Sequence, residues 1–296
     1  MDNYVIHYKY ILGKGTFGKV YLAQDRYNKK LVAVKVEDKT RNSLLKKEYG
    51  FIRFLQEQEE TSTGKDHIIK HLLFLEDNRH YYMFTDLYGP NIDYLHRRCG
   101  RKFSVNTTVK IAKQMLDSIR YCHEQGIVHR DIKPANFMVA FCKPHTKIYL
   151  GDYGLSKKYI INDKHIPCQT EVSRVGSMRY MSKYTHRGIQ ASCRDDIYSL
   201  AYAIIFMPTG WLPWSDDLVE GKEKNQRHNA LYVMKSKTPN TDITSKIPND
   251  KLKNLMTDCL DYLDTLEFAY NVKYEFLSQQ LEQFEVTADW DWNNDK

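Results

Sequence analysis

The sequence predicts an α+β protein with a small strand-rich unit followed by a larger helical unit. Short runs rich in Tyr, Val, Ile and Leu recur up to residue 87, and turn residues at Gly89 and Pro90 then interrupt the pattern. Beyond them, apolar residues between 105 and 119 recur in steps of four and three, as on one face of a helix. This change of pattern places the boundary between the two units near residue 89.

The strand-rich unit is expected to hold five strands and one helix. Apolar and charged residues within 43–58 are spaced as in an amphipathic helix. Composition and bounding turns predict strands at 8–12, 19–24, 31–36, 68–75 and 81–87.

The helical unit is expected to begin with a long helix between Ser104, a suitable N-cap, and Gly126, a suitable terminator. Short apolar runs with polar residues between them follow this helix. Helical patterns resume at 195–207 and, less regularly, at 251–284.

Composition excludes several protein classes. Of the 296 residues, 42% are hydrophobic and 27% charged, which is enough apolar material for a core and excludes general disorder. The N-terminus lacks an apolar signal segment, and the longest nearly apolar run, 197–207, is too short to cross a bilayer. The six cysteines form no closely spaced pair and are expected to be free thiols. We therefore expect an intracellular protein without a membrane segment, in the cytoplasm or the nucleus.

The net charge of +7 is concentrated in the middle of the chain. Residues 89–250 contain 25 basic and 15 acidic side chains, which suggests an anionic ligand or substrate or simply a solvated basic surface. Nucleic-acid binding is the weaker alternative, because no recognised motif or interleaved aromatic platform accompanies the charge.

The segment GKGTFGKV at 13–20 fits the pattern G-x-G-x-x-G-x-V, which phosphate-binding loops and dinucleotide-binding folds share. A dinucleotide loop opens a helix, whereas KVYLAQ after Gly18 is strand-like. The segment is therefore expected to join two strands and to fold over phosphates, whose close approach glycine permits.

Lys35 lies at the end of the apolar run LVAVK, where an unpaired ammonium would be costly. Glu48 on the following helix is the expected partner, and a lysine held in this way is suited to bind the phosphates of ATP. A purely structural ion pair is the alternative for this pair alone.

The strongest motif is HRDIKPAN at 129–136, followed by DYG at 152–154. Asp131 is expected to orient an acceptor hydroxyl and take its proton, and Lys133 to face the transferring phosphoryl group. Asn136 and Asp152 carry the hard oxygen ligands that Mg²⁺ prefers. Together with the glycine-rich loop and its lysine, the order and spacing predict phosphoryl transfer from ATP.

At this point the chain resembles the protein kinase superfamily, and its details are similar to the casein kinase I family of Ser/Thr kinases. MSK at 181–183 stands where most kinases have A-P-E, as in that family. The resemblance rests on the segments LYGPNIDYL, RKFS, DYGLSKKY, HIP, RVGSMRYMSKYTHRGIQASCRDD, GWLPW and DWDWN, which span nearly the whole chain.

The resemblance implies a bilobal protein kinase domain over residues 1–296, with an N-lobe to about 85, a hinge at about 86–89 and a C-lobe from about 90. ATP would bind between the lobes with Mg²⁺, which Asn136 and Asp152 would hold. Asp196 would support the backbone of the catalytic loop. The residues implied to line the nucleotide site are Leu12, Gly13, Gly15, Phe17, Gly18, Val20, Ala33, Lys35, Thr85 as gatekeeper, Asp86, Leu87, Tyr88 and Asn136.

The resemblance also implies Ser or Thr acceptors with an acidic or phosphorylated residue upstream. Arg179 matches one member of a basic recognition site, and both Lys224 and Arg227 are candidates for the second. Arg130 could pair with a phosphate on Thr170, Ser173 or Ser177, although the family suggests activity without it. The protein is expected to act as a monomer, and a catalytically inactive scaffold is the competing interpretation.

Overall fold

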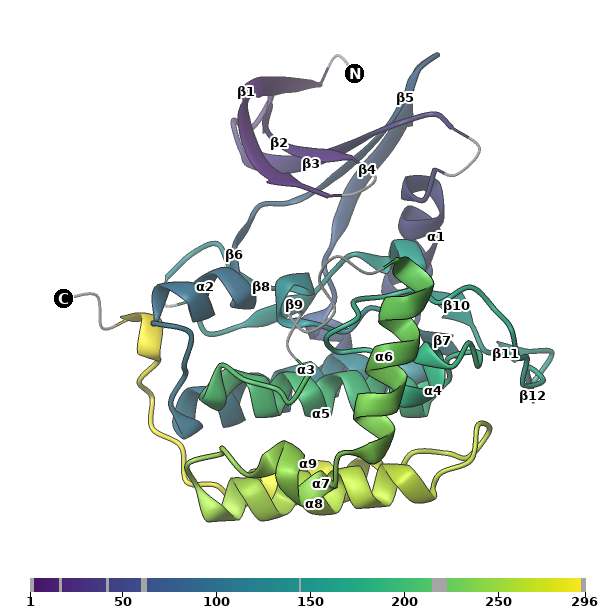
Figure 1. Cartoon of the computed structure of the whole chain (residues 1–296). Coiled ribbons are helices and arrows are strands. Elements are labelled where there is room, and N and C mark those ends of the chain that lie inside the picture. Colours follow the sequence, from purple (N-terminus) through teal and green to yellow (C-terminus); the bar gives the residue numbers. More distant parts are fainter. Residues whose placement is uncertain are drawn as a thin grey trace.

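The computed structural model describes residues 3–15, 18–40, 43–59, 63–143, 145–214 and 223–293. A sheet-rich N-terminal region lies above a larger helical region, as Figure 1 shows. This is the α+β, two-lobed architecture that the sequence predicts. None of the described helices is both long enough and apolar enough to span a bilayer.

The N-terminal region is built on one antiparallel sheet with strand order β1-β2-β3-β5-β4. The expected strands are all present, but the first begins earlier and the fourth later than predicted, since Ile68 and Ile69 precede β4. The strands are β1 (Tyr4–Lys14), β2 (Lys19–Asp25), β3 (Leu31–Asp38), β4 (His71–Glu76) and β5 (His80–Asp86).

The predicted helix of this region is α1 (Leu45–Glu57), which is followed by a short 3-10 turn, η1 (Thr63–His67). Its buried residues Leu45, Ile52 and Leu55 join the large core that continues into the helical region. A separate small core on the sheet contains Ala23, Val32, Val34, Tyr82 and Phe84. The helix therefore packs at the junction of the two regions (Figure 1).

The helical region is organised around α3 (Val105–Glu124) and the fully buried α5 (Cys193–Thr209). Ser104 caps α3 as expected, since its hydroxyl accepts a hydrogen bond from Thr107 N. Gly126 follows the helix with φ of +72°, a conformation that suits glycine. The surrounding helices are α2 (Ile92–Arg98), α4 (Lys183–His186), α6 (Lys224–Lys237), α7 (Asn240–Thr244), α8 (Asp250–Thr265) and α9 (Tyr274–Glu282), with the 3-10 turn η5 (Asp291–Asn293) near the C-terminus.

Short strands between α3 and α5 carry the polar segments that the sequence singled out. They form the pairs β7-β10 and β11-β12 and, together with β6 from before α2, the sheet β6-β8-β9. Their bounds are β6 (Tyr88–Asn91), β7 (Ile127–Val128), β8 (Phe137–Ala140), β9 (Ile148–Leu150), β10 (Lys157–Lys158), β11 (Ile160–Ile161) and β12 (Lys164–His165), with the turns η2 (Pro134–Asn136) and η3 (Tyr153–Leu155) between them.

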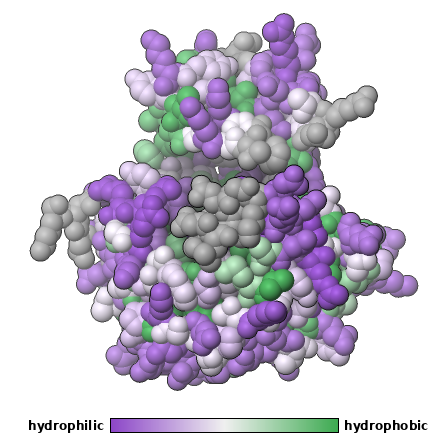
Figure 2. Space-filling model, in the orientation of Figure 1, coloured by the Kyte–Doolittle hydropathy of each residue, from purple (hydrophilic) through white to green (hydrophobic). Residues whose placement is uncertain are grey.

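The face seen in Figure 2 is largely hydrophilic, with apolar residues scattered among charged ones. Scattered apolar side chains are normal on a soluble surface. The polar segments around the junction of the two regions are therefore a stronger indication of a functional site than the scattered apolar residues of this face.

Candidate active site

The glycine-rich segment joins two antiparallel strands. Gly13 pairs with Val20 and Lys14 with Lys19, so the chain turns back from β1 into β2. A Cβ on Gly18 would lie 2.3 Å from the carbonyl oxygen of Val36, which explains why glycine is needed there. The helix that a dinucleotide loop requires is absent after Gly18, because β2 follows. Phe17 lies outside the described residues.

Lys35 and Glu48 form the expected ion pair, with 2.6 Å between Lys35 Nζ and Glu48 Oε2. Lys35 Nζ also lies 3.4 Å from Asp152 Oδ1, so one ammonium contacts both carboxylates. Burial alone would lower the pKa of Lys35, but the charges and hydrogen bonds of Glu48 and Asp152 outweigh it and raise that pKa. Lys35 is therefore fixed as a cation facing the segment after β9.

The catalytic-loop motif brings together three side chains. Lys133 Nζ lies 2.7 Å from Asp131 Oδ2, and the Ser177 hydroxyl donates to Asp131 Oδ1 over 2.8 Å. Lys133 Nζ also donates to Ser177 Oγ over 2.9 Å. Sequence reasoning considered Ser177 only as a phosphorylation candidate, since its proximity to Asp131 depends on how the segment after β12 folds back.

Asn136 and Asp152 are the candidate magnesium ligands. The Asn136 amide nitrogen donates to the carbonyl oxygen of Asp131 over 2.8 Å, so the amide is oriented by the same loop. Asp152 has the left-handed φ of 62°, which is strained for a residue with a Cβ and recurs at functional sites. Partial burial would raise the pKa of the Asp152 carboxyl, but the charges of Lys35, His129 and Lys133 outweigh it and lower that pKa.

The side-chain oxygens of Asn136 and Asp152 suit Mg²⁺ better than they suit a metal ion that takes all its ligands from the protein. Within the described residues, no group of three or more His, Cys, Asp or Glu side chains could hold a metal ion. One carboxylate and one amide oxygen match the preference of Mg²⁺ for a few protein oxygens supplemented by phosphate and water.

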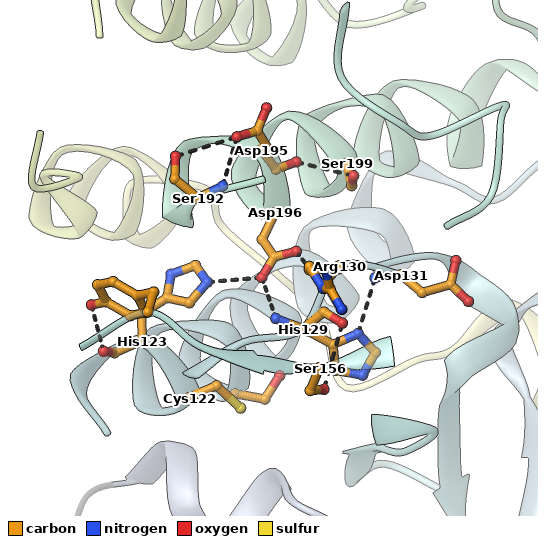
Figure 3. A network of polar contacts seen from close by, with 12 residues as sticks. Cys122, His123, His129, Arg130, Asp131, Ser156, Ser192, Asp195, Asp196 and Ser199 are labelled. Atoms are coloured by element: carbon orange, nitrogen blue, oxygen red, sulfur yellow. Dashed lines mark hydrogen bonds and ion pairs between the residues drawn. The ribbon is translucent and has the colours of Figure 1, made fainter. Parts of the chain in front are cut away.

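Asp196 at the start of α5 organises the backbone of the catalytic loop, as Figure 3 shows. Its two carboxylate oxygens accept hydrogen bonds from His129 N over 2.7 Å and Arg130 N over 2.8 Å. Arg130 is held at a left-handed φ of 69°, and these bonds help to keep it there. The contact between Asp196 and the loop is as expected from the sequence.

His123 is a further member of this network that sequence reasoning did not identify. Its Nε2 lies 2.9 Å from Asp196 Oδ2, and its Nδ1 lies 2.6 Å from the hydroxyl of Tyr274. Both His123 and Asp196 are almost completely buried. Because His123 lies at the end of α3 and Asp196 at the start of α5, only the packing of the two helices reveals the pair.

Comparison with known proteins decides the family. Residues 6–266 match the family model described as the protein kinase domain. The chain belongs to the protein kinase family. Its sheet-rich and helical regions are accordingly the two lobes of the bilobal kinase fold.

The similarity to casein kinase I is also confirmed. Casein kinase I homologs 1 and 2 of Schizosaccharomyces pombe are each 31% identical to this kinase, over 97% and 98% of its length. The chain spans 64% and 65% of these two relatives, which is less than two thirds of each.

Sheet register places the residues implied to line the nucleotide site next to each other. Val20 is paired with Lys35, and Ala33 with Thr85 at the end of β5. Asp86 of the expected hinge forms an ion pair of 2.7 Å with Lys30, which the sequence did not predict. The remaining residues lie on β1 (Leu12 and Gly13), between β1 and β2 (Gly15 and Gly18), between β5 and β6 (Leu87) and at the start of β6 (Tyr88). Their role in binding stays a prediction.

The predicted substrate residues lie on two segments. The Arg179 guanidinium is centred 5.1 Å from the ring of Phe206, and the Arg179 carbonyl accepts from Trp214 Nε1 over 2.8 Å. Lys224 and Arg227 belong to the first turn of α6. Arg174, which the sequence did not assign to this site, joins the two segments by donating to Asn225 Oδ1 over 3.1 Å.

Proposed function

We propose that this chain is a Ser/Thr protein kinase of the casein kinase I type, which transfers the γ-phosphoryl group of ATP to protein substrates with Mg²⁺ as cofactor. The observation that carries the proposal is the convergence of Lys35, Asp131, Lys133 and Asp152 on one place between the lobes. The two casein kinase I homologs support the subfamily.

The chemistry assigned to each residue follows from its contacts. Lys35, held by Glu48, is placed to bind the phosphates of ATP. Asp131 orients the acceptor hydroxyl and accepts its proton as the oxygen attacks, and Lys133 faces the charge on the transferring group. Mg²⁺ held by Asn136 and Asp152 would offset the negative charge of the phosphates.

The test of the activity is transfer of labelled γ-phosphate to casein. We expect Asp131→Asn to lower kcat by about 100- to 10,000-fold while the protein stays folded, because general-base catalysis is lost. Asp258, exposed on α8, supplies the matched control Asp258→Asn, which is expected to keep wild-type activity. ATP binding without any transfer by the wild-type chain would instead favour an inactive scaffold.

We further propose that this kinase prefers acceptors with an acidic or phosphorylated residue upstream, recognised by Arg179 together with Lys224 or Arg227. The basic excess of residues 89–250 supports this preference. One charge-assisted hydrogen bond corresponds to a preference of about 10- to 150-fold for a phosphorylated peptide.

Peptides that differ only in this upstream phosphate measure the preference. Arg179→Ala should remove it, whereas Arg79→Ala, a change on the exposed turn between β4 and β5, should leave it intact. Equal kcat/KM for both peptides with the wild-type chain would contradict the proposal.

We also infer that the kinase acts as a monomer inside the cell, in the cytoplasm or nucleus, where its free cysteines would stay reduced.

A further inference from the structure

The start of α1 is held by a carboxylate from another element. Glu37 lies near the end of β3 and is 5% exposed. Its Oε1 accepts a hydrogen bond from Leu44 N, and its Oε2 accepts one from Leu45 N, each over 2.8 Å. A single side chain thus takes two of the backbone N–H groups that a helix leaves without partners at its first turn.

This cap replaces the one that the helix lacks in its own sequence. Leu44 occupies the N-cap position, and its side chain can accept no hydrogen bond. A carboxylate is also well suited to the partial positive charge at a helix N-terminus. Glu37 therefore performs, from β3, the function that Ser, Thr, Asp or Asn usually performs from within the local chain.

The cap lies beside the Lys35–Glu48 ion pair. Lys35 and Glu37 are two positions apart on β3, so both side chains project from the same face of the sheet. Glu48 lies one turn into α1, and its backbone N donates to the carbonyl oxygen of Leu44, the residue whose own N–H is capped. β3 thus holds the first turn of α1 at two neighbouring points.

These contacts restrict how α1 can move. The later part of the helix is anchored by Ile52 and Leu55, which are fully buried in the large core. The first turn contributes Leu45 to that core, and its start is otherwise fixed from β3 by the Glu37 hydrogen bonds and the Lys35–Glu48 ion pair. Without them the first turn could fray or tilt while the rest of the helix remained packed.

We propose that Glu37 is a positioning residue that caps α1 from β3 and thereby holds Glu48 against Lys35. The inference rests on the proposed kinase function, since the ion pair acts on ATP. Glu37 itself touches neither nucleotide nor acceptor and acts through α1.

Glu37→Ala is expected to lower kcat/KM for ATP by about 3- to 30-fold, the range that loss of a helix cap corresponds to. Glu37→Gln keeps one acceptor oxygen without the charge and should fall between the wild type and Glu37→Ala. The matched control is Asp38→Ala at the next position, whose carboxylate is 81% exposed and pairs only at the surface with His80. This control is expected to keep wild-type kinetics.

A double-mutant cycle separates positioning from general destabilisation. In a Glu48→Gln background, Glu37→Ala should change kcat/KM for ATP by less than about twofold, because the ion pair it supports is already lost. A full additional loss in that background, or wild-type kinetics for Glu37→Ala alone, would overturn the inference.

Hydrogen exchange distinguishes this inference from the proposed function. Amides 44–48 of Glu37→Ala should exchange faster than those of the wild type, whereas amides near Ile52 and Leu55 should keep their protection. Unchanged exchange at 44–48 would overturn the cap even if the wild-type chain transferred no phosphate. Faster exchange in an inactive chain would retain the cap and refute only the proposed function.

Discussion

Lys235 is a buried cation that holds the segment carrying Arg179. It is 3% exposed, and its ammonium donates to the carbonyl oxygens of Met178, Arg179 and Met181 over 2.9, 3.1 and 2.6 Å. The ring of Trp214 lies 4.7 Å from Nζ. Three carbonyls and an aromatic face compensate for removing the charge from water.

Replacement of Lys235 by Met should therefore remove a donor that three backbone carbonyls share. We expect the free energy of unfolding to fall by about 1–3 kcal/mol, because Met181 O loses the Lys235 ammonium, whereas Arg179 O keeps the hydrogen bond from Trp214. The KM for a peptide substrate should rise, whereas the KM for ATP should stay near the wild-type value. Lys237→Met, at an exposed position of the same helix, is the control. Urea unfolding and steady-state kinetics measure both effects, and an unchanged peptide KM would show that the segment does not depend on Lys235.

At the scale of elements, the segment after α9 caps the first turn of α3. Asp291 accepts hydrogen bonds from Ser104 N over 2.6 Å and from Ser104 Oγ over 2.8 Å. Trp292 packs against Phe103 with ring centroids 5.6 Å apart, and Lys110 Nζ lies 4.0 Å from the centroid of Trp290. A helix from the middle of the chain thus depends on residues nearly at its end.

Loss of the Asp291 carboxylate should weaken this cap without opening the core. Asp291→Ala is expected to lower the free energy of unfolding by about 1 kcal/mol, the usual effect of losing an N-terminal cap. The control Asp289→Ala removes a neighbouring carboxylate, while the backbone carbonyl of Asp289 still accepts from Asn106. Chemical unfolding of both variants gives the comparison, and equal stability of the two would contradict the assigned role.

For the whole molecule, the buried pair His123–Asp196 links α3, α5 and α9 to the catalytic loop. Burial alone would lower the pKa of His123, but its interactions with Cys193 and Asp196 outweigh burial and raise the pKa from 6.5 to about 10. Tyr159 and Tyr274 also lie against His123, and their hydroxyl groups are protonated at neutral pH. The folded protein therefore retains a proton that the unfolded chain releases near neutrality.

This difference predicts a loss of stability on the alkaline side. Since the folded state binds one more proton than the unfolded state above pH 6.5, stability is fully present below that pH and declines as the pH approaches about 10. We expect the free energy of unfolding to decline with rising pH between about pH 7.5 and 9. Urea midpoints across this range measure it. His123→Asn should abolish the slope, and a flat wild-type profile would show that His123 is neutral in the folded protein.

Local patterns in the sequence were sufficient to predict most helices and strands and the reactive side chains of the candidate site. The long helix from Ser104, the strand on each side of the glycine-rich segment and the motif that carries Asp131 depend on spacing along the chain. The order of the motifs along the chain, taken together, also predicted the type of fold. Helix and strand periodicities depend on a few consecutive residues, so they can be recognised without knowing how the rest of the chain packs.

Only the tertiary structure decided which distant side chains support that site. His123 meets Asp196 across 73 positions, and Asp291 meets Ser104 across 187. α6 contains several lysines with no strong apolar periodicity, so its sequence could not indicate that Lys235 is the buried one. In the sequence, Glu37 is likewise one of several charged residues after an apolar run, and only the packing of α1 reveals its contacts with Leu44 and Leu45. The sequence by itself determined the chemistry and the local elements, because both depend on residue type and short spacing. The supporting contacts were decided by packing, because burial and geometry determine which of many similar polar groups find a partner.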